Sequence, residues 1–465
     1  MATPSAADPS IALTLHALAR AHPERPALVA EDGRRWTLGA LDRLARQAQR
    51  ALAGREVVVL RADNGPELVV AFLGAIYAGL AVHPLHAGTP DGELVRRGLA
   101  PTPPPDLAAL AALEPAPEPA AAPPAAPGLL LSTSGTTGEP RDVVIGHGSL
   151  GAHTRAVASV LGLGPGDRVL GVLPLAHSYG CRMALLAPLV SGAEVHVVGR
   201  FSARGTLGLM AARAITWAPV VPTMLAAWVA APEADVRLAL RWVLSAGAPL
   251  PEPLRVAAEA RLGADVRQGY GLSEASFACI DAPGPTGPPG LGARARAAGT
   301  VGRPVPGVEV RLGAADEIQV RGANLMLGYR DAAGTSSSGL TTSDGWLATG
   351  DVGRFDADGN LVVVDRVKDI VLVGGHTVHP AEVEAVLHEH PGVDAVAVVG
   401  APDPYYGEVL EAHVVSRDPG LGADELEAFA RSRLAAHKVP VRWRFAAALP
   451  VGASGKVLRR ALRGG

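Results

Sequence analysis

Hydrophobic residues recur with helical and strand spacing along most of the chain. Residues 38–52 carry apolar side chains on one face of a predicted helix, at Leu38, Leu41, Leu44, Ala45 and Ala48. Short apolar strands and helices then alternate, as EVVVLRAD, ELVVAFLGAIYAGL and AVHPL. The alternation resumes at GLLLSTS and continues to about residue 310. This order predicts an α/β fold with mixed, mostly parallel sheets layered with helices.

The pattern restarts on a smaller scale near Asp365. The stretches IVLVGG, VDAVAVVGAPD and VLEAHVVS have strand character, and HPAEVEAVLHEH and ADELEAFARSRLAAH have helical character. We therefore predict a large N-terminal domain over residues 1–364 and a small α+β C-terminal domain over residues 365–465. Within the large domain, residues 101–127 are rich in Pro and Ala, which indicates an extended or partly helical surface linker.

Composition narrows the classes of function. Hydrophobic residues make up 48% of the 465 residues, so the chain can bury cores in more than one domain. The formal net charge of −3 gives no reason to expect nucleic acid or a membrane surface as a partner. The two cysteines, Cys181 and Cys279, lie far apart, which disfavours a disulfide scaffold or a zinc site. With no apolar run of roughly 18 residues and no targeting segment at the N-terminus, we expect a soluble cytoplasmic protein.

The stretch STSGTTGEPR, residues 132–141, begins with seven consecutive Ser, Thr or Gly residues. It lies between two apolar stretches and lacks the Gly-Lys-Ser/Thr ending of a P-loop. Successive backbone N–H groups and hydroxyls can still surround a polyphosphate, and Arg141 adds a positive charge. Taken alone, the stretch favours a Ser/Gly connector over a phosphate-binding loop.

A second stretch, GYGLSE, follows a short predicted strand. Tyr270 lies between Gly269 and Gly271, so its ring can approach a flat base closely. Ser273 and Glu274 offer a hydroxyl and a carboxylate, which suit a phosphate and Mg²⁺. The alternative interpretation is a turn with a packed tyrosine.

Three further stretches carry candidate charged residues, two of which follow a glycine. In DGWLATGD, Asp351 follows a glycine and can accept hydrogen bonds from two ribose hydroxyls. Arg366 comes fifteen residues later, in VVVDRVKDIV. In SGKVLRR, Lys456 lies in a glycine-flanked turn, where a lone lysine would ordinarily be a solvated surface charge.

Together these stretches resemble the adenylate-forming (ANL) superfamily, which includes acyl- and aryl-CoA ligases, firefly luciferase and the adenylation domains of peptide synthetases. The similarity runs along almost the whole chain and rests on STSGTTGEPR, LPLAHSYG, VVPTML, SAGAPL, GYGLSE, GTVGRPVPGVEV, VRGANLMLGY, GWLATGD, DRVKDIVLVGGHTVHPAEVE and ASGKVLRR. The resemblance implies an enzyme that uses ATP to convert a carboxylic acid to an acyl-adenylate and pyrophosphate. A thiol then displaces AMP, and the small domain moves between the two steps.

The resemblance also implies roles for individual residues. The ATP or AMP would be bound by Thr133, Ser134, Gly135, Thr136, Thr137, Gly138, Arg141, Gly247, Ala248, Pro249, Tyr270, Gly271, Asp351 and Arg366. Within this set, Tyr270 would stack on the adenine and Asp351 would bind the ribose. Ser273 would contact the α-phosphate, Glu274 would hold Mg²⁺, and Lys456 would bridge the acid and the α-phosphate. Lys368 would be the hinge, and Gly374 and Gly375 would line the thiol tunnel.

The acid pocket is expected around LPLAHSYG. Its implied residues are His177, Ser178, Tyr179, Ala246, Gln268 and Gly269. The stretch has no Asp to pair with an α-ammonium group, so an amino acid is disfavoured, and aryl and medium-chain acyl acids both remain open. The thiol is CoA or the phosphopantetheine of a carrier protein. A nucleotide-binding regulator without catalysis is a third possibility, and the presence of Lys456, Glu274 and Asp351 together argues against it.

Five positions depart from the pattern of the family. Arg141 stands for the usual Lys, Ser273 for Thr, and Leu372 for a frequent Lys. Asp142 and Asp365 each stand where a Gly is usual. Asp142 is an unexpected acid beside a triphosphate loop, which would either point to solvent or weaken ATP binding. The Pro/Ala tract also replaces a strand–helix unit, so the sheet is expected to be trimmed at one edge.

Overall fold

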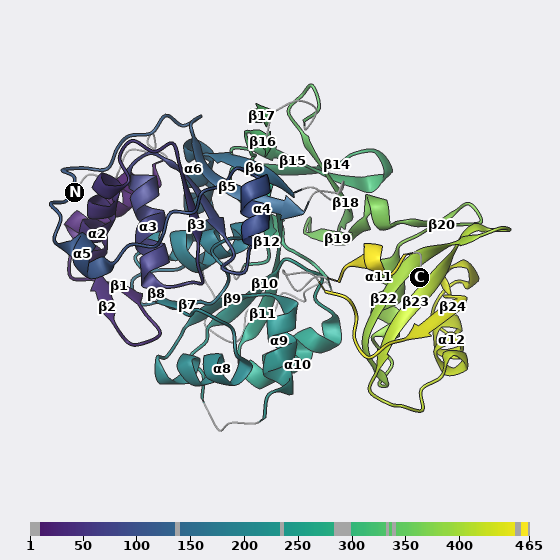
Figure 1. The fold of residues 1–465 in the computed structure, drawn as a ribbon. Helices are drawn as coiled ribbons and strands as arrows, with labels where there is room; N and C mark the ends of the chain where they lie inside the picture. The colour runs from purple at the N-terminus through teal and green to yellow at the C-terminus, as the bar shows by residue number, and fades with distance from the viewer. Residues whose placement is uncertain are drawn as a thin grey trace.

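The computed structural model describes residues 10–134, 140–232, 237–282, 299–331, 334–336, 341–451 and 457–463. In Figure 1 a large part runs from purple through teal to green, and a small part in yellow-green lies beside it. Within the described ranges the large part contains three sheets and the small part contains one. The predicted α/β class, with a large N-terminal unit and a small C-terminal α+β unit, is confirmed.

The largest sheet has nine strands. In spatial order they are β13 (Arg303–Pro304), β12 (Ser276–Ile280), β11 (Asp265–Leu272), β10 (Trp242–Ala246), β9 (Trp217–Val220), β7 (Arg168–Gly171), β8 (Glu194–Val197), β1 (Pro26–Val29) and β2 (Arg35–Thr37). The strands from β11 to β1 are parallel to their neighbours, whereas β12, β13 and β2 are antiparallel. The carboxyl ends of the parallel strands therefore meet at one edge of the sheet.

Two more sheets complete the large part. The six-stranded sheet has the order β17 (Gly334–Ser336), β16 (Gly328–Asp331), β6 (Pro140–Gly146), β5 (Pro127–Ser134), β4 (Ala81–Leu85) and β3 (Val57–Arg61). The four-stranded antiparallel sheet has the order β14 (Val308–Leu312), β15 (Glu317–Gly322), β18 (Leu347–Phe355) and β19 (Leu361–Arg366). The hydroxyl-rich stretch connects β5 to β6 in the first of these sheets.

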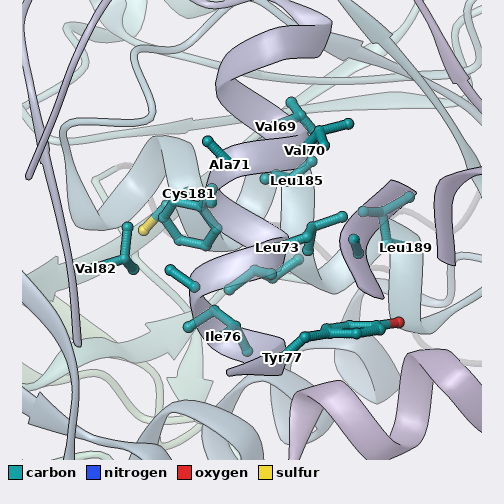
Figure 2. Close-up of a cluster of buried hydrophobic side chains, with 14 of the residues drawn as sticks. Val69, Val70, Ala71, Leu73, Ile76, Tyr77, Val82, Cys181, Leu185 and Leu189 are labelled. Carbon is teal, nitrogen blue, oxygen red and sulfur yellow. The ribbon is translucent and has the colours of Figure 1, made fainter. Parts of the chain in front are cut away.

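Helices cover and separate the sheets. They are α1 (Ile11–Ala21), α2 (Leu38–Ala51), α3 (Pro66–Tyr77), α4 (Asp91–Arg96), α5 (Leu107–Ala111), α6 (His147–Leu161), the π-helix η1 (Gly180–Leu186), α7 (Ala187–Val190), α8 (Ala203–Ala212), α9 (Pro222–Ala230) and α10 (Glu252–Leu262). Almost every residue of α3 is buried. Figure 2 shows its side chains among Val82 of β4, Cys181 and Leu185 of η1 and Leu189 of α7.

The Pro/Ala tract is partly helical, since α5 lies within it, and it is fixed to the large part. Side chains of α2 bind its backbone carbonyls: Arg46 binds that of Ala116, and Gln47 binds those of Ala111 and Leu113. Leu110 of the tract is buried beneath α2. The tract is therefore packed against α2 and is not a flexible linker.

The small part contains β20 (Val371–Val373), β21 (His376–Val378), α11 (Pro380–Leu387), β22 (Val393–Asp403), β23 (Gly407–Ser416), α12 (Ala423–Arg431) and β24 (Arg442–Phe445). Its buried core includes Val378, Val383, Leu387, Val398 and Leu426, separate from the cores of the large part. The short helix η3 (Val367–Asp369) connects it to β19. In the part of the chain that the structure describes, no helix has both the length and the apolar character needed to cross a membrane.

Both cysteines are free and fully buried. Cys181 lies on η1 against α3, and Cys279 lies on β12. Burial raises the pKa of each thiol to about 12. Both side chains therefore behave as small hydrophobic groups rather than nucleophiles.

Candidate active site

Three of the expected nucleotide-binding residues follow β10 directly. Gly247 has φ of +88°, a conformation that favours glycine, and it starts the turn that continues through Ala248 and Pro249. The next strand, β11, aligns Gly269 with Ala246 and ends in the turn that carries Ser273 and Glu274. The two turns therefore lie side by side at the carboxyl edge of parallel strands, where open α/β sheets bind ligands.

Tyr270, Asp351 and Arg366 come together from three strands. The Tyr270 hydroxyl donates to Oδ2 of Asp351 at 2.7 Å, and Arg366 Nε lies 2.9 Å from Oδ1. Asp351 is buried and is paired in register with Arg366 across β18 and β19. Gly350 before it has φ of +73°. Burial and the neighbouring Asp351 charge raise the pKa of Tyr270 well above its usual value, so its hydroxyl stays a proton donor.

The base of the hydroxyl-rich stretch lies close to Glu274. Thr133 at the end of β5 donates its hydroxyl to the Arg141 carbonyl at 3.2 Å. The Arg141 guanidinium lies 5.8 Å from the centre of the Tyr329 ring, and the Tyr329 hydroxyl donates to Glu274 at 2.7 Å. Ser134 ends β5. The predicted phosphate-binding residues Gly135, Thr136, Thr137 and Gly138 lie outside the described residues.

Asp142 does not point to solvent. Its carboxylate is buried and accepts hydrogen bonds from Arg97 and from Ser132, the latter at 3.0 Å, and lies 3.4 Å from His83. Burial alone would raise the pKa of Asp142, but His83 and Arg97 outweigh it and the pKa lies below its usual value. In the β5–β6 ladder, Ser132 pairs with Asp142 and Thr133 with Arg141. Because strand residues alternate in direction, Asp142 faces away from Arg141.

The expected acid-pocket residues 177–179 precede η1. His177 Nε2 lies 2.9 Å from Nε2 of His86, which follows β4. The Tyr179 hydroxyl donates to the Leu244 carbonyl of β10 at 2.6 Å and accepts from the Val220 amide of β9. The Ser178 hydroxyl oxygen is buried and has no hydrogen-bond partner in the part of the chain that the structure describes. These residues therefore lie against the carboxyl halves of the central strands.

Phe277 of β12 fills the space beside Gly269. A Cβ atom at Gly269 would lie only 2.6 Å from the Phe277 ring, and the Tyr179 ring centre is 5.2 Å from that of Phe277. Gln268 points to the other side of β11 and donates to the Thr300 carbonyl at 3.4 Å. Phe277 therefore occupies the space beside Gly269, one of the expected acid-pocket residues.

The expected hinge and tunnel residues lie on the small part's side. Lys368 is exposed on η3, and its carbonyl accepts from Arg463 at 3.3 Å. Gly374 and Gly375 turn the chain between β20 and β21, with φ of +56° and +84°. A Cβ atom at Gly374 would lie 3.1 Å from the Tyr406 ring, so this turn packs closely against the β22–β23 turn.

Lys456 lies outside the described residues. Val451 and Val457, on either side of the undescribed segment, form an antiparallel bridge. Leu372, which replaces a frequent Lys of the family, is 54% exposed on β20.

Asp365 links the two parts of the molecule. It belongs to β19, in a sheet of the large part, yet its Oδ2 accepts from the Ala381 amide in the first turn of α11 at 2.9 Å. Arg459 Nη1 lies 3.9 Å from its other oxygen, and Arg459 also binds Glu384 at 2.7 Å and Asp369 at 3.4 Å. A glycine at position 365 would make none of these contacts.

Three residues of this region were not singled out by the sequence. Tyr329 lies within the family motif VRGANLMLGY, and its hydroxyl-bearing aromatic side chain could have identified it as a candidate site residue. His86 follows β4 and Phe277 lies on β12, and no local pattern distinguished either one. Both are recognised only through the residues they contact, His177 and Gly269.

The arrangement of the sheets and the small C-terminal part is that of the adenylate-forming enzymes. ATP-bound MatB from Rhodopseudomonas palustris has the same fold, with a TM-score of 0.88 over 98% of each chain at 23% identity. o-Succinylbenzoate CoA synthetase (MenE) from Bacillus subtilis, solved with its acyl-adenylate intermediate, has a TM-score of 0.80 at 28% identity over 97% of each chain.

The sequence matches the AMP-binding enzyme family over residues 15–98 and 95–330, and the C-terminal domain of AMP-binding enzymes over residues 382–456. The protein therefore belongs to the AMP-binding enzyme family, which confirms the resemblance. A sulfoacetate–CoA ligase of Cupriavidus necator is 36% identical over 97% of this chain and 98% of its own length. A feruloyl-CoA synthase of an Amycolatopsis species is 38% identical over 72% of this chain and 69% of its own length.

Proposed function

We propose that the protein is an AMP-forming acid–thiol ligase. It joins a carboxylic acid to the α-phosphate of ATP, releasing pyrophosphate, and then transfers the acyl group from AMP to the thiol of CoA. The observation that carries this proposal is the buried Asp351 carboxylate, held by Tyr270 and Arg366 where β11 ends. Family membership and the CoA-ligase relatives support it.

The first step requires two anions to meet, so charge must be neutralised where it accumulates. In our proposal, Asp351 accepts the ribose hydroxyls, and Tyr270 lies against the adenine beside Gly247, Ala248 and Pro249. The hydroxyl-rich stretch and Arg141 hold the β- and γ-phosphates. Ser273 contacts the α-phosphate, and Lys456 bridges it to the acid.

Glu274 is suited to hold a magnesium ion. Its carboxylate is half-buried, and Tyr329 engages one of its oxygens while the described residues give the other no hydrogen bond. In the described part of the chain, no three His, Cys, Asp or Glu residues gather as metal ligands. Phosphate oxygens and water would therefore supply most of the coordination, as is common for Mg²⁺. The ion would offset the charge of the phosphates.

We propose an aryl or medium-chain acyl acid as the substrate and the cytoplasm as the compartment, because two free thiols fit a reducing environment. The relatives are named for very different acids, so their names do not identify the acid that this protein uses. The second candidate acceptor is the phosphopantetheine of a carrier protein, which presents the same thiol arm as CoA.

The test is ATP–pyrophosphate exchange across a panel of aryl, aliphatic and amino acids. We expect exchange with at least one aryl or acyl acid and none with amino acids. Adding CoA or a holo carrier protein and weighing the products by mass spectrometry then identifies the acceptor. Failure of every acid to support exchange would contradict the proposal.

A Tyr329→Phe variant is expected to bind magnesium less effectively. The lost hydroxyl donates to Glu274, and a hydrogen bond to a charged group is worth about 1.5–3 kcal/mol. We expect kcat/KM for ATP to fall roughly 10-fold, with a higher Mg²⁺ concentration needed for half-maximal exchange. Tyr405→Phe, at an exposed tyrosine of the small part, is the matched control. An unchanged Mg²⁺ titration would show that Tyr329 does not position Glu274.

An Asp365→Gly variant is expected to loosen the small part. The half-buried Ala381 amide would lose its acceptor, which costs up to about 1–3 kcal/mol. If the chain rotates about Lys368, as we propose, the Asp365 contacts exist in only one arrangement of the two parts. We therefore expect faster proteolysis within residues 366–370 and a changed ratio of the adenylation and thioester rates.

The Asp365→Asn variant serves as the comparison, because its side-chain oxygen can still accept from the Ala381 amide. It should lie between the wild type and Asp365→Gly in both readouts. If Asp365→Gly changes neither proteolysis nor the ratio of rates, Asp365 does not hold the two parts together.

A further inference from the structure

Arg182 is a buried arginine that has no negatively charged partner among the described residues. It lies on η1, three residues after Tyr179, and only 1% of its surface is exposed. Its Nη1 lies 3.3 Å from Nδ1 of His153 on α6. Among the residues that the structure describes, none forms a hydrogen bond with its Nε or Nη2 atom, and no carboxylate forms an ion pair with it.

His153 does not neutralise the positive charge of Arg182. Burial lowers the pKa of Arg182 to about 10, so the guanidinium is charged at neutral pH. Burial and the charge of Arg182 lower the pKa of His153 to about 3, so the imidazole is neutral. His153 Nε2 lies 2.8 Å from the Phe277 carbonyl, so Nε2 carries the proton and Nδ1 accepts from Arg182. Burying a charge without a counter-ion costs free energy. An anion bound beside Arg182 would offset that cost.

The free atoms of Arg182 form one edge of the guanidinium. Nε–H and Nη2–H point in the same direction, which is the side-on geometry for two oxygens of a carboxylate or sulfonate. Ser178, one helical turn earlier, also has a buried hydroxyl without a partner. Ser178 and Arg182, two residues with unsatisfied donors, thus lie on the segment that begins with the expected acid-pocket residues.

Several contacts join Arg182 to that pocket. The His153 imidazole lies between Arg182 and the Phe277 carbonyl. The Phe277 ring in turn packs on Gly269 and Tyr179. Met183, the next residue, belongs to the same hydrophobic cluster as Phe277. Cys181 on the other side points toward α3 (Figure 2). A π-helix, the conformation of η1, is rare and is often found at functional sites.

We propose that the substrate acid carries a second anionic group, a carboxylate or a sulfonate, and that Arg182 binds this group through its Nε–Nη2 edge. This inference rests on the proposed function, since it concerns the acid that the enzyme activates. One carboxylate of the substrate reacts at the α-phosphate, and the second anion is held at Arg182. Phe277 contacts both Gly269 and His153, so its ring has to shift when such an acid enters.

The experiment compares two-anion acids with single-anion acids of similar size in the pyrophosphate exchange assay. Sulfoacetate and succinate are the two-anion probes, and propanoate and butanoate are the single-anion probes. We expect kcat/KM to favour the two-anion probes by about 10²-fold or more, because a site built for a polar group rejects analogues that lack it. Arg182→Met should abolish this preference, because kcat/KM for sulfoacetate and succinate should fall far more than kcat/KM for propanoate and butanoate. Arg431→Met, at an exposed arginine of α12, is the matched control.

Thermal melting of the wild-type protein without ATP supplies a second readout that needs no variant. Sulfoacetate or succinate should raise the melting temperature and propanoate should not, since only the former pair with Arg182. Preference for single-anion acids, together with no shift in melting, would overturn this inference and leave the proposed function intact. If neither these probes nor the aryl and aliphatic acids of the panel support exchange, the proposed function itself fails. If Arg182→Met keeps the preference for two-anion acids, another residue binds the second anion.

Discussion

A Lys456→Ala variant should lose acyl-adenylate formation by roughly 10²–10³-fold, the usual cost of removing one preorganised group that stabilises charge in a transition state. In the first step the acid oxygen approaches a negatively charged phosphate, and a cation between them lowers the barrier. The second step transfers the acyl group to a thiol and does not bring two anions together. We therefore expect preformed acyl-adenylate to react with CoA at a nearly normal rate.

The chain offers a matched control for this variant because it contains only three lysines, at positions 368, 438 and 456. Lys438 pairs with Glu382 on the surface of the small part at 2.7 Å. Lys438→Ala should affect neither half-reaction, since an exposed ion pair contributes little. The assay measures pyrophosphate exchange for the first step and acyl-CoA formation from synthetic acyl-adenylate for the second. Equal loss of both half-reactions in Lys456→Ala would exclude the assigned role.

An Asp351→Asn variant should lower kcat/KM for ATP by about 10²-fold, because it weakens charge-assisted hydrogen bonds. Before ATP binds, Tyr270 and Arg366 each engage one oxygen of Asp351. In the proposed complex, the ribose hydroxyls donate to these same oxygens, so the carboxylate must accept several donors at once. The asparagine side chain has one acceptor oxygen and presents an NH₂ group to Arg366, so it cannot serve all of them.

The control for Asp351→Asn lies on the same hairpin. Asp358, in the turn between β18 and β19, is exposed, and Asp358→Asn should leave the kinetics unchanged. Titrating ATP at saturating acid separates the two effects, because loss of ribose binding raises KM for ATP more than it lowers kcat. A loss confined to kcat, with KM for ATP unchanged, would mean that Asp351 acts in the chemical step rather than in binding ATP.

The sequence predicted the features that depend on local patterns. The apolar spacing of residues 38–52 became α2, and the strand–turn–strand patterns became paired strands. Tyr270, Asp351 and Arg366, singled out from stretches nearly a hundred residues apart, meet in the structure. Their roles toward ATP remain predictions, since the contacts describe the protein without its substrates.

The features that escaped prediction depend on long-range pairing. The partners of Asp142 come from β4, from the end of α4 and from β5, and only the order of strands in the sheet brings His83 and Arg97 to it. Asp365 departs from the family pattern for a reason visible only when α11 lies beside β19. The absence of a counter-ion for Arg182 likewise emerges only once its surroundings are folded. Motif spacing carries none of this information.

The burial of both cysteines bears on how the reaction can be followed. An acyl-adenylate is a mixed carboxylic–phosphoric anhydride that reacts with any accessible thiolate, and a thiol with a pKa of about 12 and no exposed surface offers none. The enzyme therefore does not acylate itself at cysteine while it waits for CoA. For the same reason a thiol-reactive dye reports CoA consumption without a background from the protein. A single cysteine introduced on the exposed face of the small part would be the one site labelled, which provides a direct optical signal for its movement.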